Sequence, residues 1–306
     1  AWVLMQQEKY ADALPLLEPL TTSERADSVS GDALLAKAIC LRQTEQYGAA
    51  IALLEPLATE PNPSVALTKS LYELGVCYLE AKKLKQASAT FDRLMKEFPQ
   101  LPDMDKVLYE YAWSLKEQQL MEPAAGAFSK LSESYPDSPL AAEADYHLGQ
   151  MAYDEQNFPR AVSFYSKAAS RTGDEGLLEK SLYKLGWSYY QQQDLEQAAA
   201  QFSRQVQVAP EGVLAIEGRF MQAECLFKRE DYAAAFELYR QARKDLEAHS
   251  AEEGMSLQAR TLCYLHGAQS ARELKKWKEV DEWLAAMLQK FPDSEYLPFA
   301  DYERAY

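Results

Sequence analysis

The chain has little glycine, cysteine and histidine, and it lacks a long apolar run. Its 306 residues include only 12 Gly, 4 Cys and 3 His. So few glycines favour long helices over a fold built from many tight turns. No apolar stretch reaches the ~18 residues that a transmembrane helix needs. The net charge of −15 disfavours nucleic acid and anionic membrane surfaces as partners, because both are themselves negative.

The four cysteines do not form a metal-binding or redox motif. None belongs to a CxxC pair, and the two closest in sequence, Cys40 and Cys77, are 37 residues apart. Free cysteine is among the most buried residue types, so we expect buried free thiols, with a disulfide or a metal site as the alternative. The remaining two are Cys225 and Cys263.

Signatures of catalysis are also missing. There is no HExxH, GxSxG, Walker or GxGxxG motif, and the histidines do not have the spacing of metal ligands. The sequence therefore predicts a non-enzymatic chain that needs no cofactor and no metal. The three histidines are His147, His249 and His266.

The stretch Glu179–Gln207 shows what the chain does contain. At helical period it gives two short amphipathic helices with a break at Gln192–Asp194. Neither helix can bury its apolar face alone, so we expect the two to pack on each other and on neighbouring pairs. The apolar face of the first helix holds Leu182, Leu185, Gly186 and Tyr189, and that of the second holds Leu195, Ala198, Phe202 and Val206.

Three columns of residues recur at steps of 37 residues, which is typical of a repeat protein. We expect the small residues to face each other where the two helices cross, with the bulky column beside them. The columns are Ala1, Ala38, Gly75, Ala112, Gly149, Gly186 and Ala223; Ala13, Ala50, Ala87, Ala124, Ala161, Ala198 and Ala235; and Leu17, Leu54, Phe91, Phe128, Tyr165, Phe202 and Tyr239.

The regular spacing is interrupted once. The step from Ala223 to Gly267 is 44 residues, and we place the extra residues between Lys244 and Ser256. They predict a longer second helix and a polar loop around His249–Gly254. Near the N-terminus, Pro19 and Pro56 lie late in the second helix of their units, where proline should kink or shorten it.

The repeat resembles the tetratricopeptide repeat. The resemblance is carried by Leu182, Leu185, Gly186, Tyr189, Ala198, Phe202 and Pro210, and equally by Leu71, Leu74, Gly75, Tyr78, Ala87, Phe91 and Pro99. The first aromatic residue of the family, a Trp, is Leu in both units, and the period exceeds the family's usual length. The resemblance implies an all-α fold, a right-handed superhelical solenoid of antiparallel helix pairs.

This resemblance covers the whole chain, which we interpret as one solenoid over residues 1–306. A half repeat occupies 1–30, full repeats start near 31, 68, 105, 142, 179, 216 and 260, and a partial first helix occupies 298–306. Both termini interrupt a first helix, so we expect the chain to be part of a longer protein.

The loops between repeats narrow the resemblance further. In Tyr135–Pro139, Pro136 stops one helix, and Ser138 is predicted to cap the next helix, with Pro139 in its first turn. Such aromatic-Pro-Asp-Ser loops in long repeats are similar to those of bacterial cell-envelope tetratricopeptide proteins, namely the outer-membrane assembly lipoprotein and the Tol–Pal-associated periplasmic type. This resemblance implies the periplasm or cell envelope, with the cytoplasm as the alternative.

In the family, the first helices line a concave groove, and an aromatic residue recurs there in this chain. Such residues either stack adjacent helices or grip a partner, and both interpretations stay open. The candidate partner-binding residues are Tyr72, Tyr109, Tyr146, Tyr183 and Phe220, then Trp113, Tyr153, Trp187, Tyr190 and Phe227, together with Lys180 and Lys184.

The same groove is expected to carry mixed charge. Lys180 and Lys184 match the basic pair with which chaperone-binding members hold a C-terminal carboxylate, but the rest of that clamp is replaced by Tyr109, Trp113 and His147. A solvated charged face is the simpler interpretation. The charges are Lys69, Glu73, Lys106, Glu110, Lys116, Glu143, Asp154, Lys180, Lys184, Glu217, Glu224 and Lys228.

These patterns favour an interaction scaffold that binds a partner peptide or helix in the aromatic-lined groove. The alternatives are binding of a glycan or cell-wall polymer by the aromatic residues, and a structural spacer with partners elsewhere. The partner is expected to be protein, with glycan possible and nucleic acid or membrane insertion not expected.

Overall fold

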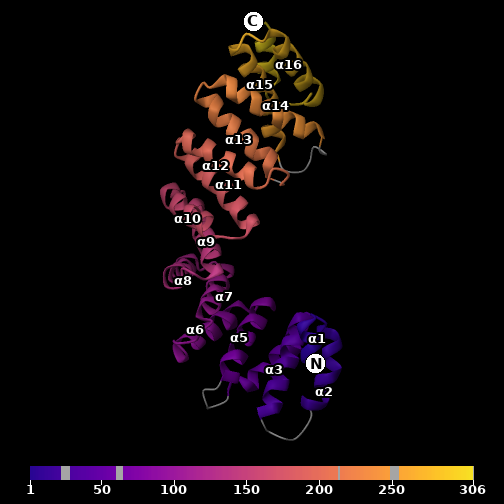
Figure 1. Cartoon of the computed structure of the whole chain (residues 1–306), viewed down its shortest axis with the longest axis vertical. Coiled ribbons are helices and arrows are strands. Elements are labelled where there is room, and N and C mark those ends of the chain that lie inside the picture. Colours follow the sequence, from indigo (N-terminus) through magenta and orange to yellow (C-terminus); the bar gives the residue numbers. More distant parts are fainter. Residues whose placement is uncertain (22–27, 60–64, 213, 249–254, 306) are drawn as a thin grey trace. The chain divides into compact units, whose positions relative to one another are not determined.

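The computed structural model describes residues 1–21, 28–59, 65–212, 214–248 and 255–305, and all regular secondary structure in these ranges is helical. This confirms the predicted all-α class. The chain divides into two compact units, residues 1–144 (unit 1) and residues 145–306 (unit 2), and Figure 1 labels most of their helices. The predicted loop at His249–Gly254 lies outside the described residues.

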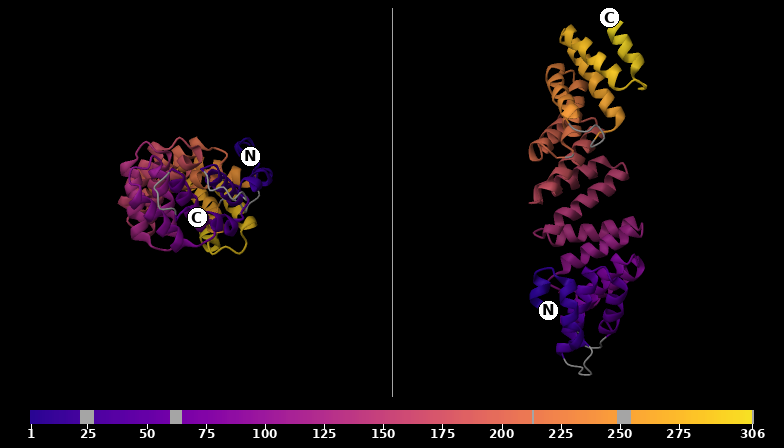
Figure 2. Two further views of the ribbon diagram at one scale, coloured as in Figure 1. Left: turned by 90° about the horizontal axis from the view of Figure 1, so that it is seen from below. Right: turned by 90° about the vertical axis from the view of Figure 1, so that its right-hand side faces the viewer.

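In unit 1, first helices alternate with second helices, and each helix from α1 to α7 packs on the next (Figure 2). The first helices α3, α5 and α7 also contact one another in turn, which makes them one packed layer. The helices are α1 (Trp2–Gln6), α2 (Tyr10–Thr21), α3 (Ser28–Gln43), α4 (Tyr47–Leu57), α5 (Val65–Glu80), α6 (Leu84–Glu97), α7 (Met104–Glu117), α8 (Met121–Ser134) and α9 (Pro139–Asp154), which continues into unit 2.

Unit 2 repeats this arrangement, with α13, α15 and α17 as successive first helices in contact. Its further helices are α10 (Phe158–Arg171), α11 (Glu175–Gln191), α12 (Leu195–Val208), α13 (Ala215–Lys228), α14 (Tyr232–Ala248), α15 (Leu257–Glu273), α16 (Trp277–Lys290) and α17 (Leu297–Ala305).

The turn inside each helix pair has one conformation throughout. The predicted break at Gln192–Asp194 is confirmed, because α11 ends at Gln191 and α12 begins at Leu195. Gln193 has a φ of 62°, and the Asp194 carboxylate caps α12 by accepting from the Gln197 backbone N–H at 3.1 Å. The equivalent left-handed residues are Glu8, Glu45, Lys82, Gln119, Gln156, Gln193 and Glu230, then Lys275.

The core follows the repeated columns. All seven alanines from Ala13 to Ala235 have no exposed surface, and the bulky column is buried beside them. The close contact differs from the expectation, because the nearest neighbours of a Cβ placed on Gly186 are ring carbons of Phe202, the closest at 2.8 Å. Gly75 and Gly149 face the rings of Phe91 and Tyr165 in the same way. Glycine therefore makes room for an aromatic ring rather than for an alanine.

The irregular units have local causes. Pro56 lies next to the last residue of α4, which has 11 residues, whereas α6 and α8 have 14 each. The predicted long second helix is α14, with 17 residues. After α14, the left-handed turn residue shifts by 45 residues, from Glu230 to Lys275. This register puts Ala268 rather than Gly267 in the small column, one residue beyond the assigned step.

Two further predictions are confirmed. All four cysteines are buried free thiols, and burial raises the pKa of Cys77 and of Cys225 to about 12. Helix α9 begins at Pro139, and the Leu140 backbone N–H donates to the Ser138 hydroxyl at 3.2 Å. That hydroxyl also lies 2.6 Å from a carboxylate oxygen of Asp105, which ties the loop to α7.

Candidate functional site

A cavity of about 470 Å³ opens among the first helices of unit 1. Leu35 and Ile39 of α3 form one side, Tyr72 of α5 lies between the helices, and Leu101 with Val107 closes the other side. Its volume is in the range of small-ligand and side-chain pockets. The polar lining consists of Thr68, Lys69, Glu73, Asp103 and Lys106, and Pro102 completes it. We call this space the unit 1 cavity.

The charges beside the unit 1 cavity are only partly paired. Arg42 donates from Nε to Glu73 at 2.9 Å, and both side chains are mostly buried. Lys106 lies 3.0 Å from Asp103 in an exposed pair. The Tyr109 hydroxyl donates to Glu143 at 2.7 Å.

Glu110, on α7, has the most perturbed carboxyl group on this surface. Burial, followed by the negative charge of Glu80, raises its pKa to about 7; Arg42 opposes the rise, and Glu143 and Glu73 add to it. Glu110 therefore holds a proton at a higher pH than a solvated carboxylate does.

The repeated aromatic residue of each first helix packs on the second helix of its own pair. Ring centroids are 6.2 Å apart for Tyr72 and Phe91, and 6.1 Å apart for Tyr109 and Phe128. The unit 2 pairs are Tyr146 with Tyr165, Tyr183 with Phe202, and Phe220 with Tyr239. These contacts give each ring a packing role, and all except Phe220 remain half-buried.

In unit 2, the second set of predicted aromatics interacts with lysines of the following repeat. Lys184 lies 5.7 Å from the ring centre of Tyr153, and Lys228 lies 4.7 Å from that of Tyr190. Trp187 packs edge-on against Tyr190, with centroids 5.6 Å apart. Trp187 also meets the rings of Tyr183 and Phe202 edge-on. The structure thus brings together most of the predicted residues of this unit.

Two further predicted residues are Trp113 and Lys180. Trp113, in unit 1, is half-buried with Lys116 over its ring at 4.8 Å. Lys180, at the start of α11, is exposed.

Two residues predicted for the groove surface are instead buried. Phe220 is only 4% exposed. Glu224 is 5% exposed and accepts hydrogen bonds from the Tyr239 hydroxyl and from His266, both at 2.6 Å. His266 in turn stacks on Phe227 with centroids 4.7 Å apart. Tyr239 and His266, on the neighbouring helices α14 and α15, hold the Glu224 carboxylate in the interior by these hydrogen bonds. The sequence of α13 alone does not indicate them.

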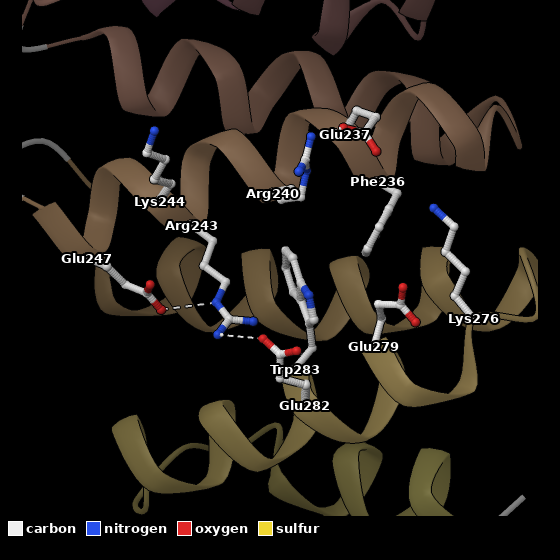
Figure 3. Close-up of a pocket in the computed structure, with 10 residues that line it drawn as sticks. All are labelled: Phe236, Glu237, Arg240, Arg243, Lys244, Glu247, Lys276, Glu279, Glu282 and Trp283. Atoms are coloured by element: carbon white, nitrogen blue, oxygen red, sulfur yellow. Dashed lines mark hydrogen bonds and ion pairs between the residues drawn. The ribbon is translucent and has the colours of Figure 1, made fainter.

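A second pocket, of about 370 Å³, lies between the second helices α14 and α16 (Figure 3). Arg243 lies 4.9 Å from the Trp283 ring centre and pairs with Glu247 at 3.0 Å and with Glu282 at 3.6 Å. Lys276 lies over the ring of Phe236 at 4.6 Å. The pocket is thus lined by charges that largely neutralise one another. The sequence reasoning did not identify it, because its walls come from helices 40 residues apart.

No group of His, Cys, Asp and Glu within the described ranges has the arrangement of a metal site. Among those same residues, no helix is long and apolar enough to cross a membrane.

Two family models match parts of the chain. Residues 109–175 and 183–250 match the tetratricopeptide repeat, and residues 6–94 match the family described as anaphase-promoting complex, cyclosome, subunit 3. No curated protein sequence matches the chain.

Solved structures share the fold at low sequence identity. The C-terminal part of a TPR repeat-containing protein from Cytophaga hutchinsonii is similar at 16% identity and a TM-score of 0.66, over 87% of this chain and 98% of that chain. The apo form of RapI is similar at 9% identity and a TM-score of 0.62, over 99% and 93%. The protein pilF from Pseudomonas aeruginosa is similar at 16% identity and a TM-score of 0.50, over 77% and 97%. These similarities show the fold, and the tetratricopeptide-repeat match itself is confined to residues 109–175 and 183–250.

Proposed function

We propose that this chain, as a tetratricopeptide-repeat protein, is an interaction scaffold whose first-helix surface binds a peptide segment of a partner protein. Repeats of this kind position side chains at regular intervals on rigid helices, which suits recognition of an extended segment or a helix. The aromatic residues supply contact area, and the charged residues select the register of the partner.

The unit 1 cavity is the observation that carries this proposal. It is open, mostly apolar, and formed by three consecutive first helices and the loop at Leu101 and Pro102. An apolar side chain of a partner gains about 25 cal/mol for each Å² that it removes from water. One well-buried anchor residue of this kind supplies a large share of the affinity in many protein interfaces.

The experiment is selection of random dodecapeptides, displayed on phage, against the full chain. We expect peptides with a shared apolar anchor position to be enriched. Ile39→Asp puts a charge into the unit 1 cavity and should reduce their affinity at least tenfold, which corresponds to about 1.4 kcal/mol. Met121→Asp makes the same change in charge at an exposed position of the same unit and should leave binding unchanged.

Because Ile39 is half-buried, its variant is accompanied by Pro102→Trp, which narrows the same cavity from an exposed residue. Circular dichroism and thermal unfolding establish that each variant is folded. The proposal would be contradicted if no peptide is enriched on the wild-type chain. It would also be contradicted if both cavity variants bind the peptides as tightly as the wild type does.

We also propose that the protein works in the bacterial cell envelope. The support is the similarity of the aromatic-Pro-Asp-Ser loops, such as Tyr135–Ser138, to those of envelope tetratricopeptide proteins. Fractionation of cells that express the natural full-length protein tests this. Recovery in the cytoplasmic fraction alone would refute it.

A further inference from the structure

The carboxylates beside the unit 1 cavity recur from one first helix to the next. Glu73 on α5 and Glu110 on α7 occupy the same place in consecutive repeats, 37 residues apart. Glu73 lines the cavity directly. Glu110 lies one helical turn along α7 from Lys106 and Val107, which both line the cavity, so it is on the same face of that helix. Its charge also contributes to the raised pKa of the Tyr72 phenol.

The two carboxylates differ in their partners. Glu73 has Arg42 at 2.9 Å. Glu110 makes no hydrogen bond and no ion pair with any residue that the structure describes, although it is half-buried. The groups that face it are Glu73 and Glu80 of α5, Arg42 of α3 and Glu143 of α9. Three of these four are acidic, so negative charge is in excess around Glu110.

We infer that the partner segment carries a lysine or arginine beside the apolar side chain that enters the unit 1 cavity, and that this cation pairs with Glu110. This inference rests on the proposed function, since it names the chemistry of the segment that the first-helix surface binds. The apolar lining alone would accept any hydrophobic residue. The uncompensated carboxylate restricts the neighbouring position, because it favours a cation and repels an acidic residue.

The physical reason is the cost of leaving a half-buried charge unpaired. A cation at hydrogen-bond distance replaces part of the lost hydration of the carboxylate and offsets repulsion from Glu80 and Glu143. Arg42 offsets this only in part, because it donates from Nε to Glu73 and makes no hydrogen bond with Glu110. The chain itself thus leaves this position for a ligand to complete.

Proton linkage gives this pairing a measurable signature. The free protein holds a proton on Glu110 with a pKa of about 7, and a bound cation favours the ionised form. Binding therefore releases a proton at and below neutral pH, and affinity rises with pH. If Glu110 is fully ionised in the complex, the dissociation constant falls about tenfold between pH ~6 and pH ~8.

The test uses the dodecapeptides selected on the full wild-type chain, synthesised with a fluorescent label. Fluorescence anisotropy gives dissociation constants at several pH values for the wild type, Glu110→Gln and Glu133→Gln. Glu133 is an exposed carboxylate of α8, so its variant has the same change in net charge away from the cavity. Peptides in which the basic residue is replaced by norleucine complete the set.

We expect the selected peptides to have Lys or Arg within about two positions of the apolar anchor, and their affinity to rise with pH. Glu110→Gln should remove both the pH dependence and the advantage of the basic peptide over its norleucine version, while Glu133→Gln keeps both. Peptides that need the cavity but show no basic preference, or binding unaffected by Glu110→Gln, would overturn the inference and leave the scaffold proposal intact. If the wild-type chain binds no peptide at all, both this inference and the scaffold proposal are wrong.

Discussion

Two tyrosines at the same position of the repeat should respond in opposite directions to loss of their hydroxyl group. Tyr165 on α10 and Tyr239 on α14 are both fully buried, and both belong to the bulky column of the second helices. The Tyr239 hydroxyl donates to Glu224 at 2.6 Å. The Tyr165 hydroxyl is buried with no hydrogen-bond partner among the described residues. At the same position, Phe202 fills the space without any hydroxyl.

The size of each effect follows from these contacts. A buried polar group without a partner costs about 1–3 kcal/mol, so Tyr165→Phe should raise the free energy of unfolding by about 1 kcal/mol or more. A hydrogen bond to a charged group contributes about 1.5–3 kcal/mol. Tyr239→Phe should therefore lower the free energy of unfolding by about that amount, because Glu224 stays buried and keeps only His266 as a partner.

Urea unfolding followed by circular dichroism measures both changes on the full chain. Repeat proteins can unfold in steps, so amide hydrogen exchange in α10 and α14 is measured as well, to assign each change to its own pair of helices. The two variants remove the same atom from the same column, and each is the control for the other. Destabilisation of the chain by Tyr165→Phe, comparable with that by Tyr239→Phe, would refute the assignment of an unpaired hydroxyl.

Two further predictions concern single residues. Gly186→Leu should destabilise the chain by about 1–3 kcal/mol, because a Cβ at this position meets the Phe202 ring at 2.8 Å. The control is Gly126→Leu, in open space on α8, which should be neutral or stabilising by less than about 1 kcal/mol. Equal shifts of the two variants in thermal unfolding would contradict this prediction. Burial raises the pKa of Glu110 from 4.5 to about 7, so the folded state binds its proton more tightly and the free energy of unfolding falls as pH rises through this interval, by up to about 3 kcal/mol. Glu110→Gln should remove that part of the pH dependence in urea titrations and Glu133→Gln should not; identical pH profiles for the two variants would count against it.

The fold could be predicted from the sequence because each packing contact inside a helix pair lies at a fixed short separation. Gly186 and Phe202 are 16 residues apart, and this spacing recurs with the repeat, so one pattern reports the same contact many times. Local capping is equally readable, as at Ser138 and Asp194, since the cap and the helix start are adjacent in sequence. The sequence spacing assigns Gly267 rather than Ala268 to the small column. The longer step occurs only once, so no second copy fixes which residue belongs to the column.

The candidate site could be predicted only as a set of positions. The repeat spacing predicts that Tyr72 and Glu110 lie on the first-helix face. In the structure Tyr72 lines the unit 1 cavity, and Glu110 belongs to the group of charges beside it. The state of each group depends on side chains one repeat away. Glu224 was placed with the surface charges in the same way, yet His266, 42 residues further along, helps to bury it.

One position of the repeat, on the first-helix face, carries a different charge environment in different repeats. Glu73 and Glu110 share one place in the repeat, but Arg42 pairs with the first and only partly offsets the negative charge around the second. In unit 2 the same place in the repeat holds His147 and then Lys184, which lies over Tyr153. Because these residues are outside the buried columns, their charge can change without a change in the packing of the helix pair. The columns therefore determine the packing of each helix pair, while the charges between neighbouring first helices can differ from repeat to repeat without disturbing it.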